Sequence, residues 1–268
     1  RLARAQYDVV ISEPSNPWMA GVAALFTREF MAAVRARLRP GGLFCQWAHT
    51  YDMSEADLRS ILATFRAVFP EGSAWLVGEA DLLLVGGVDV APDVSRLEAA
   101  FQRPGIAADL RRVDVSGAGD VAGLRIADAA GLARLAGNAP PQQDDRLALE
   151  FSAPRSLAAR TGQGNLAWLQ AGAPSQTLTA GAWASRGRML ARAEAWQLAL
   201  ASLARAVQGG VADEATLEAF TRAAAAAGQV ATAIDVLRAS VAREVASSPD
   251  DSSRRAALAR LLAARGEV

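Results

Sequence analysis

Along the first 90 residues, hydrophobic residues recur in some segments every two positions, which is typical of strands, and in others about every 3.6 positions, which is typical of helices. Tyr7 to Ser12 is a β-branched run that predicts a buried parallel strand. A helix is predicted from about Ala24 to Leu38, and Arg39-Pro40-Gly41-Gly42 is expected to end it. Its apolar face consists of Phe30, Met31, Val34 and Leu38. Leu43 to Ala48 is then predicted as the second strand.

A capped helix and a hairpin are predicted next. Ser54 is expected to cap the helix, with Asp57 at the position that can return the bond. The apolar stripe of this helix consists of Leu58, Ile61, Leu62, Phe65, Val68 and Phe69. Ala74 to Val77 and Asp81 to Val85 predict a hairpin around Gly78-Glu79-Ala80. The order β-α-β-α-β-β predicts an α/β fold and matches the second half of a methyltransferase-like Rossmann fold.

The pattern becomes irregular after residue 90 and wholly helical after Ala182. Short helices are predicted at Asp93–Phe101 and Ala129–Leu135, a strand-like stretch at Leu147 to Phe151, and a linker or loose connection over 153–180. The later helices are predicted at Ala182–Arg192, Ala195–Val207, Glu214–Ala227, Val230–Val245 and Ser252–Arg265.

These later helices are interpreted as tetratricopeptide-like repeats. The turns at Ala193, Gly228 and Gly266 lie roughly 35 and 38 residues apart, close to the ~34-residue period of such helix pairs. Four regions are therefore predicted: a partial Rossmann-like domain at 1–90, an extension at 91–155, a linker at 156–181 and incomplete repeats at 182–268.

Composition narrows the function classes. The 28 basic and 28 acidic residues give a net charge of zero, so no nucleic-acid partner is expected. The single Cys excludes an internal disulfide and suits a reducing compartment such as the cytoplasm. The single His argues against a His-based zinc site. No membrane segment is expected in this chain, and attachment through N-terminal segments absent here stays open. The chain starts with Arg1 rather than Met, which favours a fragment of a longer protein.

A carboxylate follows the first predicted strand directly. Glu13 begins the turn Glu13-Pro14-Ser15-Asn16-Pro17-Trp18, in which two prolines prevent regular helix or strand. Ligands of doubly wound sheets bind beyond the carboxyl ends of the strands, so Glu13 is a candidate for chemistry. Gln46, His49 and Tyr51 leave the second predicted strand at the same edge.

Several segments together resemble the spermidine synthase (polyamine aminopropyltransferase) family. They are Tyr7-Asp8-Val9-Val10-Ile11-Ser12-Glu13-Pro14-Ser15-Asn16-Pro17, Leu25-Phe26-Thr27-Arg28-Glu29-Phe30 and Leu38-Arg39-Pro40-Gly41-Gly42. Asp144-Asp145-Arg146 through Arg155 also looks like a segment that bacterial spermidine synthase-like proteins carry after the fold. The resemblance implies the C-terminal half of the family's Rossmann domain, because the glycine-rich loop of the first half does not precede Tyr7.

The resemblance also implies residue roles. Glu13 falls on the family's catalytic Asp, which is the base for the amine, and Asn16 falls on a second Asp that helps hold the polyamine. A Gln near Gln46 lines the polyamine in the family, and Trp18 and Tyr51 are expected to bind substrate beside it. The implied reaction is aminopropyl transfer from decarboxylated S-adenosylmethionine to a polyamine.

Other interpretations remain open for the whole chain. S-adenosylmethionine itself is an alternative cosubstrate, which would make the protein a methyltransferase, and neither donor is expected to bind this chain alone. A polyamine or other amine is the expected small-molecule partner. Alternatively, the Rossmann portion is a non-catalytic scaffold, and the helical repeats bind a protein partner.

Individual residues also have structural interpretations. Glu13 can accept hydrogen bonds from its own turn, and Asn16 is a common turn residue. Trp18 and His49 can pack in the core, and Cys45 is interpreted as an inert core thiol. Five further acidic residues either add negative potential near the site or serve as caps and solvated turns: Asp52, Glu55, Asp57, Asp144 and Asp145.

Overall fold

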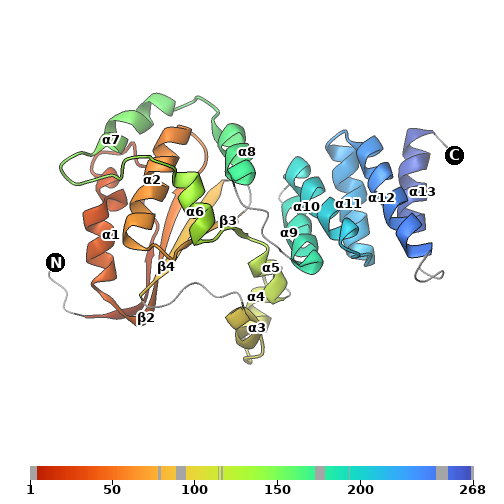
Figure 1. Cartoon of the computed structure of the whole chain (residues 1–268), viewed down its shortest axis with the longest axis horizontal. Coiled ribbons are helices and arrows are strands. Elements are labelled where there is room, and N and C mark those ends of the chain that lie inside the picture. The colour runs from red at the N-terminus through yellow and green to blue at the C-terminus, as the bar shows by residue number, and fades with distance from the viewer. Residues whose placement is uncertain are drawn as a thin grey trace. The chain divides into compact units, whose positions relative to one another are not determined.

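The computed structural model describes residues 5–77, 80–88, 95–113, 115, 117–172, 179–192, 194–245 and 253–266 (Figure 1). The chain divides into two compact units. Unit 1 comprises Arg1–Val94 and Leu124–Gln176, and unit 2 comprises Ser95–Gly123 and Thr177–Val268. Unit 1 contains a five-stranded sheet with helices, and the described elements of unit 2 are all helices, so the predicted α/β fold class is confirmed.

Five strands form the sheet of unit 1 in the order β1-β2-β4-β3-β5. They are β1 (Tyr7–Ser12), β2 (Leu38–His49), β3 (Ser73–Val77), β4 (Asp81–Gly87) and β5 (Arg125–Ala127). β1 and β2 are parallel, and β4 is antiparallel to both β2 and β3. The predicted parallel pair and hairpin are therefore confirmed, although Gly78 and Glu79 of the predicted turn lie outside the described residues.

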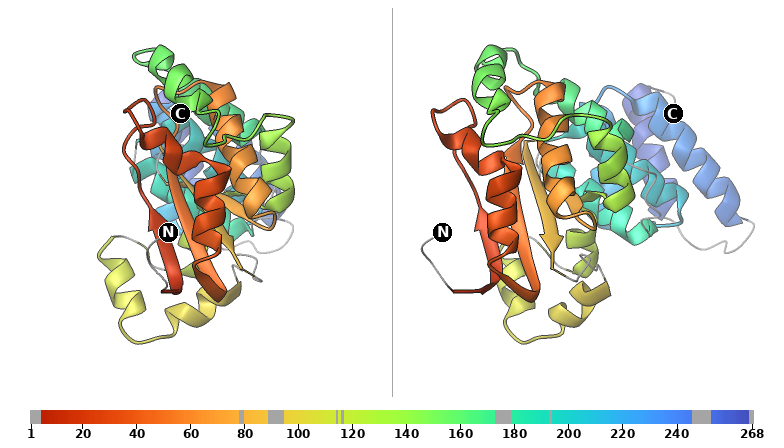
Figure 2. Two further views of the ribbon diagram at one scale, coloured as in Figure 1. Left: turned by 90° about the vertical axis from the view of Figure 1, so that its left-hand side faces the viewer. Right: turned by 60° about the vertical axis from the view of Figure 1, so that its left-hand side comes forward.

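Three helices cover one face of this sheet (Figure 2). They are α1 (Arg28–Arg35), α2 (Glu55–Val68) and α6 (Ala129–Ala136). The predicted apolar stripe of α2 is buried, and Phe65 and Phe69 lie 6.2 and 5.5 Å from Phe44 of β2 between ring centroids. Each fully buried side chain of this kind contributes roughly 1.5–3 kcal/mol, so this layer forms the core of unit 1.

The start of α2 confirms the predicted cap and changes one detail of it. Ser54 Oγ accepts a hydrogen bond from the Asp57 N–H at 3.1 Å. The Asp57 carboxylate does not return to the Ser54 backbone but accepts from the Ser54 hydroxyl at 2.7 Å and from the Ser152 hydroxyl. Asp57 is therefore a buried structural carboxylate rather than a ligand of the site.

β1 is exposed, so the prediction of a buried strand is wrong. Tyr7, Val9 and Ile11 are 43%, 57% and 70% exposed. The cause is the position of β1 at the edge of the described sheet, where only β2 borders it. The apolar composition of an interior strand thus occurs here on an edge strand.

The first helix is shorter than predicted. A 3₁₀ turn, η1 (Val22–Phe26), comes first, and Thr27 then caps α1 by accepting from the Phe30 N–H at 3.2 Å. α1 already ends at Arg35 and β2 begins at Leu38, so Arg39-Pro40-Gly41-Gly42 lies inside this strand and does not end the helix. The pairing shifts there, because Tyr7 pairs with Leu38 but Val9 pairs with Leu43, and Gly41 takes up the bend with a φ of 79°.

Two segments predicted as strand and loose connection are helical instead. They form α7 (Ala148–Ser152), the 3₁₀ turn η2 (Ala153–Ser156) and α8 (Gly162–Gly172). The alternation of Leu147, Leu149 and Phe151 suggested a strand, but the Leu149 N–H is bound by Gln142 Oε1 at 3.1 Å instead of by a neighbouring strand. Only Leu149 of the three is fully buried.

A buried polar network attaches the segment before α7 to α2. Gln142 Nε2 donates to Ser60 Oγ at 2.7 Å, and the Gln142 N–H donates to Thr64 Oγ1 at 2.8 Å. The Ser60 hydroxyl donates in turn to the Pro140 carbonyl at 2.6 Å. Because a buried polar group without a partner is costly, these bonds fix the segment in one position.

Unit 2 confirms the five helices predicted from Ala182 onward. Its elements are α3 (Ser95–Phe101), α4 (Ile106–Arg111), α5 (Ala118–Ala122), α9 (Ala180–Arg192), α10 (Trp196–Gln208), α11 (Glu214–Ala226), α12 (Val230–Val245) and α13 (Ser253–Arg265). Leu203, Phe220 and Leu237 are fully buried in the core that α9 to α13 share. Gly228 and Gly266 have φ values of 67° and 72°, which suits glycine at a helix end, whereas Ala193 and Asp93 lie outside the described residues.

Replacing Gln142 should destabilise unit 1. Gln142→Ala removes the acceptor of the buried Leu149 N–H and is expected to lower the free energy of unfolding by about 1–3 kcal/mol. Urea titration followed by circular dichroism measures this loss. Gln143→Ala is the matched control, because the neighbouring side chain takes no part in the network, and its effect should stay within about 0.5 kcal/mol. Equal losses in both variants would contradict the assigned role of Gln142.

Candidate functional site

The carboxyl ends of β1 and β2 lie side by side. Ser12, the last residue of β1, pairs with Gln46 in parallel register. The chain then leaves β1 at Glu13, next to the end of β2 at His49. Because parallel strands end at the same edge of a sheet, residues from both strands can contact one ligand there.

The turn after β1 exposes its carboxylate. Pro14 and Pro17 are buried, whereas Glu13 is exposed. In the part of the chain that the structure describes, the Glu13 carboxylate makes no hydrogen bond or ion pair. The alternative interpretation, in which Glu13 accepts hydrogen bonds from its own turn, is therefore wrong. The Asn16 carbonyl accepts from the Met19 N–H at 3.0 Å, which makes Asn16 part of the turn, and its side chain is half-buried.

Four aromatic rings gather at the end of β2. His49 lies at the centre of this group. The ring centroids of Trp18, Trp47 and Tyr51 lie 5.0, 5.4 and 4.5 Å from that of the imidazole. Trp47 and His49 alternate in β2 and so lie on one face of the strand, and Tyr51 follows two residues after its end, against the imidazole. Trp18 arrives from the turn after β1 and meets the imidazole edge to face. We call these four residues the aromatic cluster.

Neighbouring elements fix one wall of the aromatic cluster and its loop. Trp47 Nε1 donates to Asp81 Oδ1 at 2.9 Å, and Asp81 starts β4 opposite His49. The loop after His49 is held by Asn165 of α8, whose amide donates to the carbonyls of Thr50 and Met53 at 2.7 Å each. Asp52 in this loop adopts a φ of 47°, a strained conformation that the two bonds help to maintain.

Burial makes His49 an unusual histidine. Desolvation lowers the pKa of its imidazole from 6.5 to about 4, against an opposite influence from the carboxylates of Asp52 and Asp81. The ring is therefore neutral at physiological pH. Neither Nδ1 nor Nε2 has a hydrogen-bond partner among the described residues, although both atoms are buried.

Gln46 lies apart from the aromatic cluster. Strand alternation places it with Phe44 and Ala48, on the buried face of β2. Its Nε2 donates to the Trp47 carbonyl at 3.0 Å, and its Oε1 is buried without a partner. Of the five predicted site residues, the structure therefore brings Trp18 and Tyr51 together around His49, places Glu13 and Asn16 in the adjoining turn, and turns Gln46 inward.

The remaining candidates have mainly structural positions. Asp144 accepts from the Thr27 hydroxyl at 2.6 Å and so supports the start of α1, and Glu55 pairs with Arg59 at 2.7 Å. Cys45 is half-buried in β2, and burial raises the pKa of its thiol, which makes it less reactive. Within the described ranges, no group of three or more His, Cys, Asp or Glu side chains is placed to hold a metal ion.

Sequence reasoning missed three residues of this arrangement, namely Trp47, Asp81 and Asn165. Trp47 stands two positions before His49, so strand alternation could have placed the two on one face. Asp81 required the register of β2 with β4, and Asn165 lies in a segment whose Gly, Ala and Ser content suggested a loose connection.

The fold and the site define an α/β domain with a candidate ligand site at the carboxyl ends of two parallel strands. Residues 1–78 match the model of the spermine/spermidine synthase domain family. The match covers β1, α1, β2, α2 and β3, and it supports the resemblance seen in the sequence of this part. None of the helices within the described residues combines the length and apolarity that a membrane crossing requires.

The depressed pKa of His49 should make stability depend on pH. The unfolded chain binds a proton near pH 6.5 and the folded chain only near pH 4, so acid favours unfolding between these values. The free energy of unfolding is therefore expected to keep its full value above about pH 6.5 and to fall as the pH drops toward about 4.

A His49→Phe variant isolates this effect from the titration of carboxylates. Phenylalanine keeps the ring and removes the unpartnered nitrogens, so the variant should be at least as stable at neutral pH and lose less stability in acid. Urea midpoints measured across this pH range for both proteins give the difference. Parallel pH curves for the two proteins would show that His49 titrates normally.

Proposed function

We propose that this chain forms the amine-accepting part of a spermidine synthase-like group transferase. The observation that carries the proposal is the free, exposed carboxylate of Glu13 at the carboxyl end of β1, beside the end of β2. The match of residues 1–78 to the spermine/spermidine synthase domain supports the same reaction class.

In this proposal Glu13 is the general base. An aliphatic ammonium has a pKa near 10 and must lose a proton before its nitrogen can attack. Glu13 accepts that proton, and the nitrogen lone pair forms a bond to the carbon next to a sulfonium. The carbon–sulfur bond then breaks, and its electron pair leaves with sulfur as a neutral thioether. A positioned base of this kind contributes on the order of 10²–10⁴ in rate.

The acceptor side of the proposed reaction is an amine, and the donor is a sulfonium. Decarboxylated S-adenosylmethionine is the donor proposed first, with S-adenosylmethionine and methyl transfer as the variant. Trp18 and Tyr51 contact the amine from the aromatic cluster. Asn16 contributes a neutral amide and Gln46 faces the core, so the charge that attracts the amine comes from Glu13 and the carboxylates near His49.

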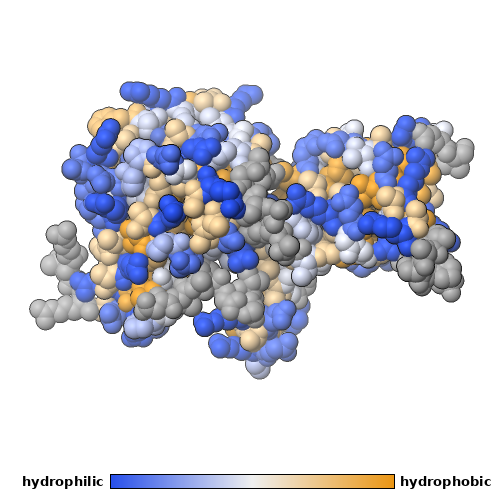
Figure 3. Space-filling view, viewed as in Figure 1, coloured by the Kyte–Doolittle hydropathy of each residue, from blue (hydrophilic) through white to orange (hydrophobic). Residues whose placement is uncertain are grey.

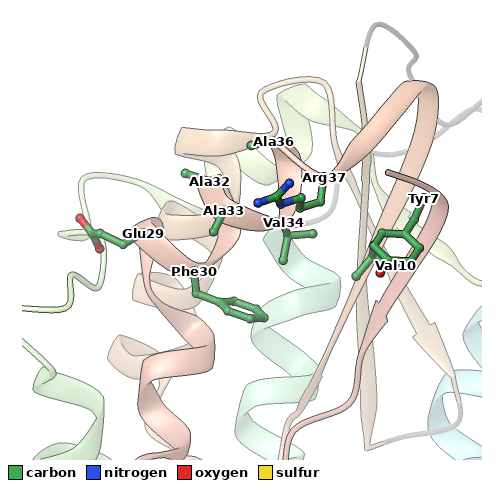
Figure 4. Close-up of a pocket in the computed structure, with 9 residues that line it drawn as sticks. All are labelled: Tyr7, Val10, Glu29, Phe30, Ala32, Ala33, Val34, Ala36 and Arg37. Carbon is green, nitrogen blue, oxygen red and sulfur yellow. The ribbon is translucent and has the colours of Figure 1, made fainter. Parts of the chain in front are cut away.

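The donor would bind beyond the open edge of β1. We propose that unit 1 is the C-terminal half of a Rossmann-like domain and that a further strand pairs with β1. Val9 and Ile11 are largely exposed there. A groove of about 910 Å³ separates β1 from α1, with Phe30 and Val34 of the helix facing Tyr7 and Val10 of the strand (Figure 4). An apolar groove beside a free strand edge is suited to a covering strand and helix.

A second candidate function is protein binding by unit 2. A groove of about 290 Å³ lies between α10, α11 and α12, with Leu200, Phe220 and Val236 in its lining. Gln197 and Gln229 supply polar groups beside it, and apolar residues remain visible between these helices in Figure 3. Tetratricopeptide-like helical hairpins would present such a groove to a peptide.

The decisive experiment measures transfer with both sulfonium donors and a panel of diamines and polyamines in the natural full-length protein. Glu13→Gln should lower the transfer rate by about 10²–10⁴ because the base is lost. Raising the pH should recover part of the rate in the variant, since more of the amine is then unprotonated.

Glu71→Gln is the matched control, because Glu71 is also exposed but lies in the turn before β3. This variant should keep the wild-type rate and pH profile. Retained transfer in Glu13→Gln at neutral pH would remove Glu13 as the base, and the absence of transfer in the wild type with every donor would favour the scaffold function.

A further inference from the structure

The single histidine of the chain is buried in an incomplete environment. His49 is fully buried, and both of its ring nitrogens lack hydrogen-bond partners within the described residues. Buried polar atoms are nearly always paired in folded proteins, because leaving one unpaired costs free energy. Gln46 Oε1, three positions earlier in β2, is also buried and unpaired. The carboxyl end of β2 therefore contains three unpaired polar atoms.

The walls around His49 differ in how firmly they are held. Trp47 is fixed by its 2.9 Å hydrogen bond to Asp81. Trp18 and Tyr51, by contrast, make no side-chain hydrogen bond in the described part of the chain and are partly exposed. Neither ring is therefore held in place by a polar contact of its side chain.

The charges around the aromatic cluster favour a cation. Asp52 and Asp81 are the carboxylates whose field reaches the imidazole, and the ring itself is neutral. Faces of tryptophan and tyrosine rings attract cations, and this attraction strengthens when water is excluded. A neutral imidazole also offers a lone pair that can accept a hydrogen bond from an ammonium group.

We propose that His49 is a ligand-binding residue whose imidazole accepts a hydrogen bond from a protonated amine enclosed by Trp18, Trp47 and Tyr51. The inference rests on the proposed function in taking the amine acceptor as the ligand. It adds a specificity-determining residue outside the carboxylate turn. Selection acts on charge, because a neutral alcohol of the same length can also donate a hydrogen bond but lacks the charge that the rings and the two carboxylates attract.

Nuclear magnetic resonance tests this directly, because His49 is the only histidine of this chain and comparison with a His49→Gln spectrum identifies its signals in the natural protein. Long-range ¹H–¹⁵N spectra of the labelled natural protein are recorded during titration with 1,4-diaminobutane and, separately, with 1,4-butanediol. The diamine is expected to shift the His49 ring nitrogens in a saturable way, and the diol is not. Unmoved His49 signals when calorimetry shows that the diamine binds would overturn the proposal, and so would the absence of diamine binding.

Variants separate this role from a packing role. His49→Phe should keep the fold and its stability but weaken diamine binding at least tenfold, whereas His49→Gln, which retains a neutral acceptor, should recover part of the affinity. Trp75→Phe is the control, since Trp75 of β3 bonds to Ser73 and makes no ring contact with His49. Diamine affinity in His49→Phe within twofold of wild type would indicate that the imidazole does not contact the diamine and would overturn the proposal.

The test is independent of catalysis. Diamine binding that shifts His49 without any group transfer would support this inference and contradict the proposed reaction. Group transfer that continues unchanged in His49→Phe would support the proposed reaction and contradict the inference.

Discussion

The parallel pairing of β1 with β2 is the constraint on which the rest of unit 1 depends. Parallel neighbours cannot be joined by a tight turn, so the chain must cross over, and it does so through the turn at Glu13, η1 and α1. The crossover brings α1 onto the face that α2 and α6 also cover. It also brings the two carboxyl ends together, and this alone places the Glu13 turn beside the aromatic cluster. The closeness of the Glu13 turn to His49 follows from that pairing.

Contacts from late in the sequence then hold the site in shape. Asn165 binds the loop after His49, and the Gln142 network secures the segment that leads toward α7. Neither contact belongs to a strand ladder, and both are buried hydrogen bonds between residues about 80 or more positions apart. The segment Leu124–Gln176 is therefore a structural part of unit 1 and not an appendage, since the loop that carries Tyr51 and Asp52 depends on it.

Local signals predicted the elements of this fold well where they were strong. The cap at Ser54 and the stripe of α2 needed only neighbouring residues, and the hairpin of β3 and β4 needed only alternation. Tertiary contacts decided the failures: α7 alternates like a strand but is helical around the bond from Leu149 to Gln142, and α8 is helical where composition predicted a loose connection. For the site, the turn at Glu13 was evident from two prolines after a strand. The meeting of Trp18 and Asp81 with His49 was not, because it depends on strand register and a crossover.

The unpaired polar atoms at the end of β2 differ from the buried polar groups that hold the rest of the site in unit 1. The buried polar side chains of Gln142, Ser60 and Asn165, which support the fold, have hydrogen-bond partners. The same chain leaves both nitrogens of His49 unpaired and surrounds them with two rings that have no polar anchor. General looseness of packing does not account for this contrast, because Met53 and Ala48 beside the site are fully buried. A site whose polar partner arrives with the ligand accounts for it, and its position at the carboxyl ends of the parallel strands is where such a ligand binds.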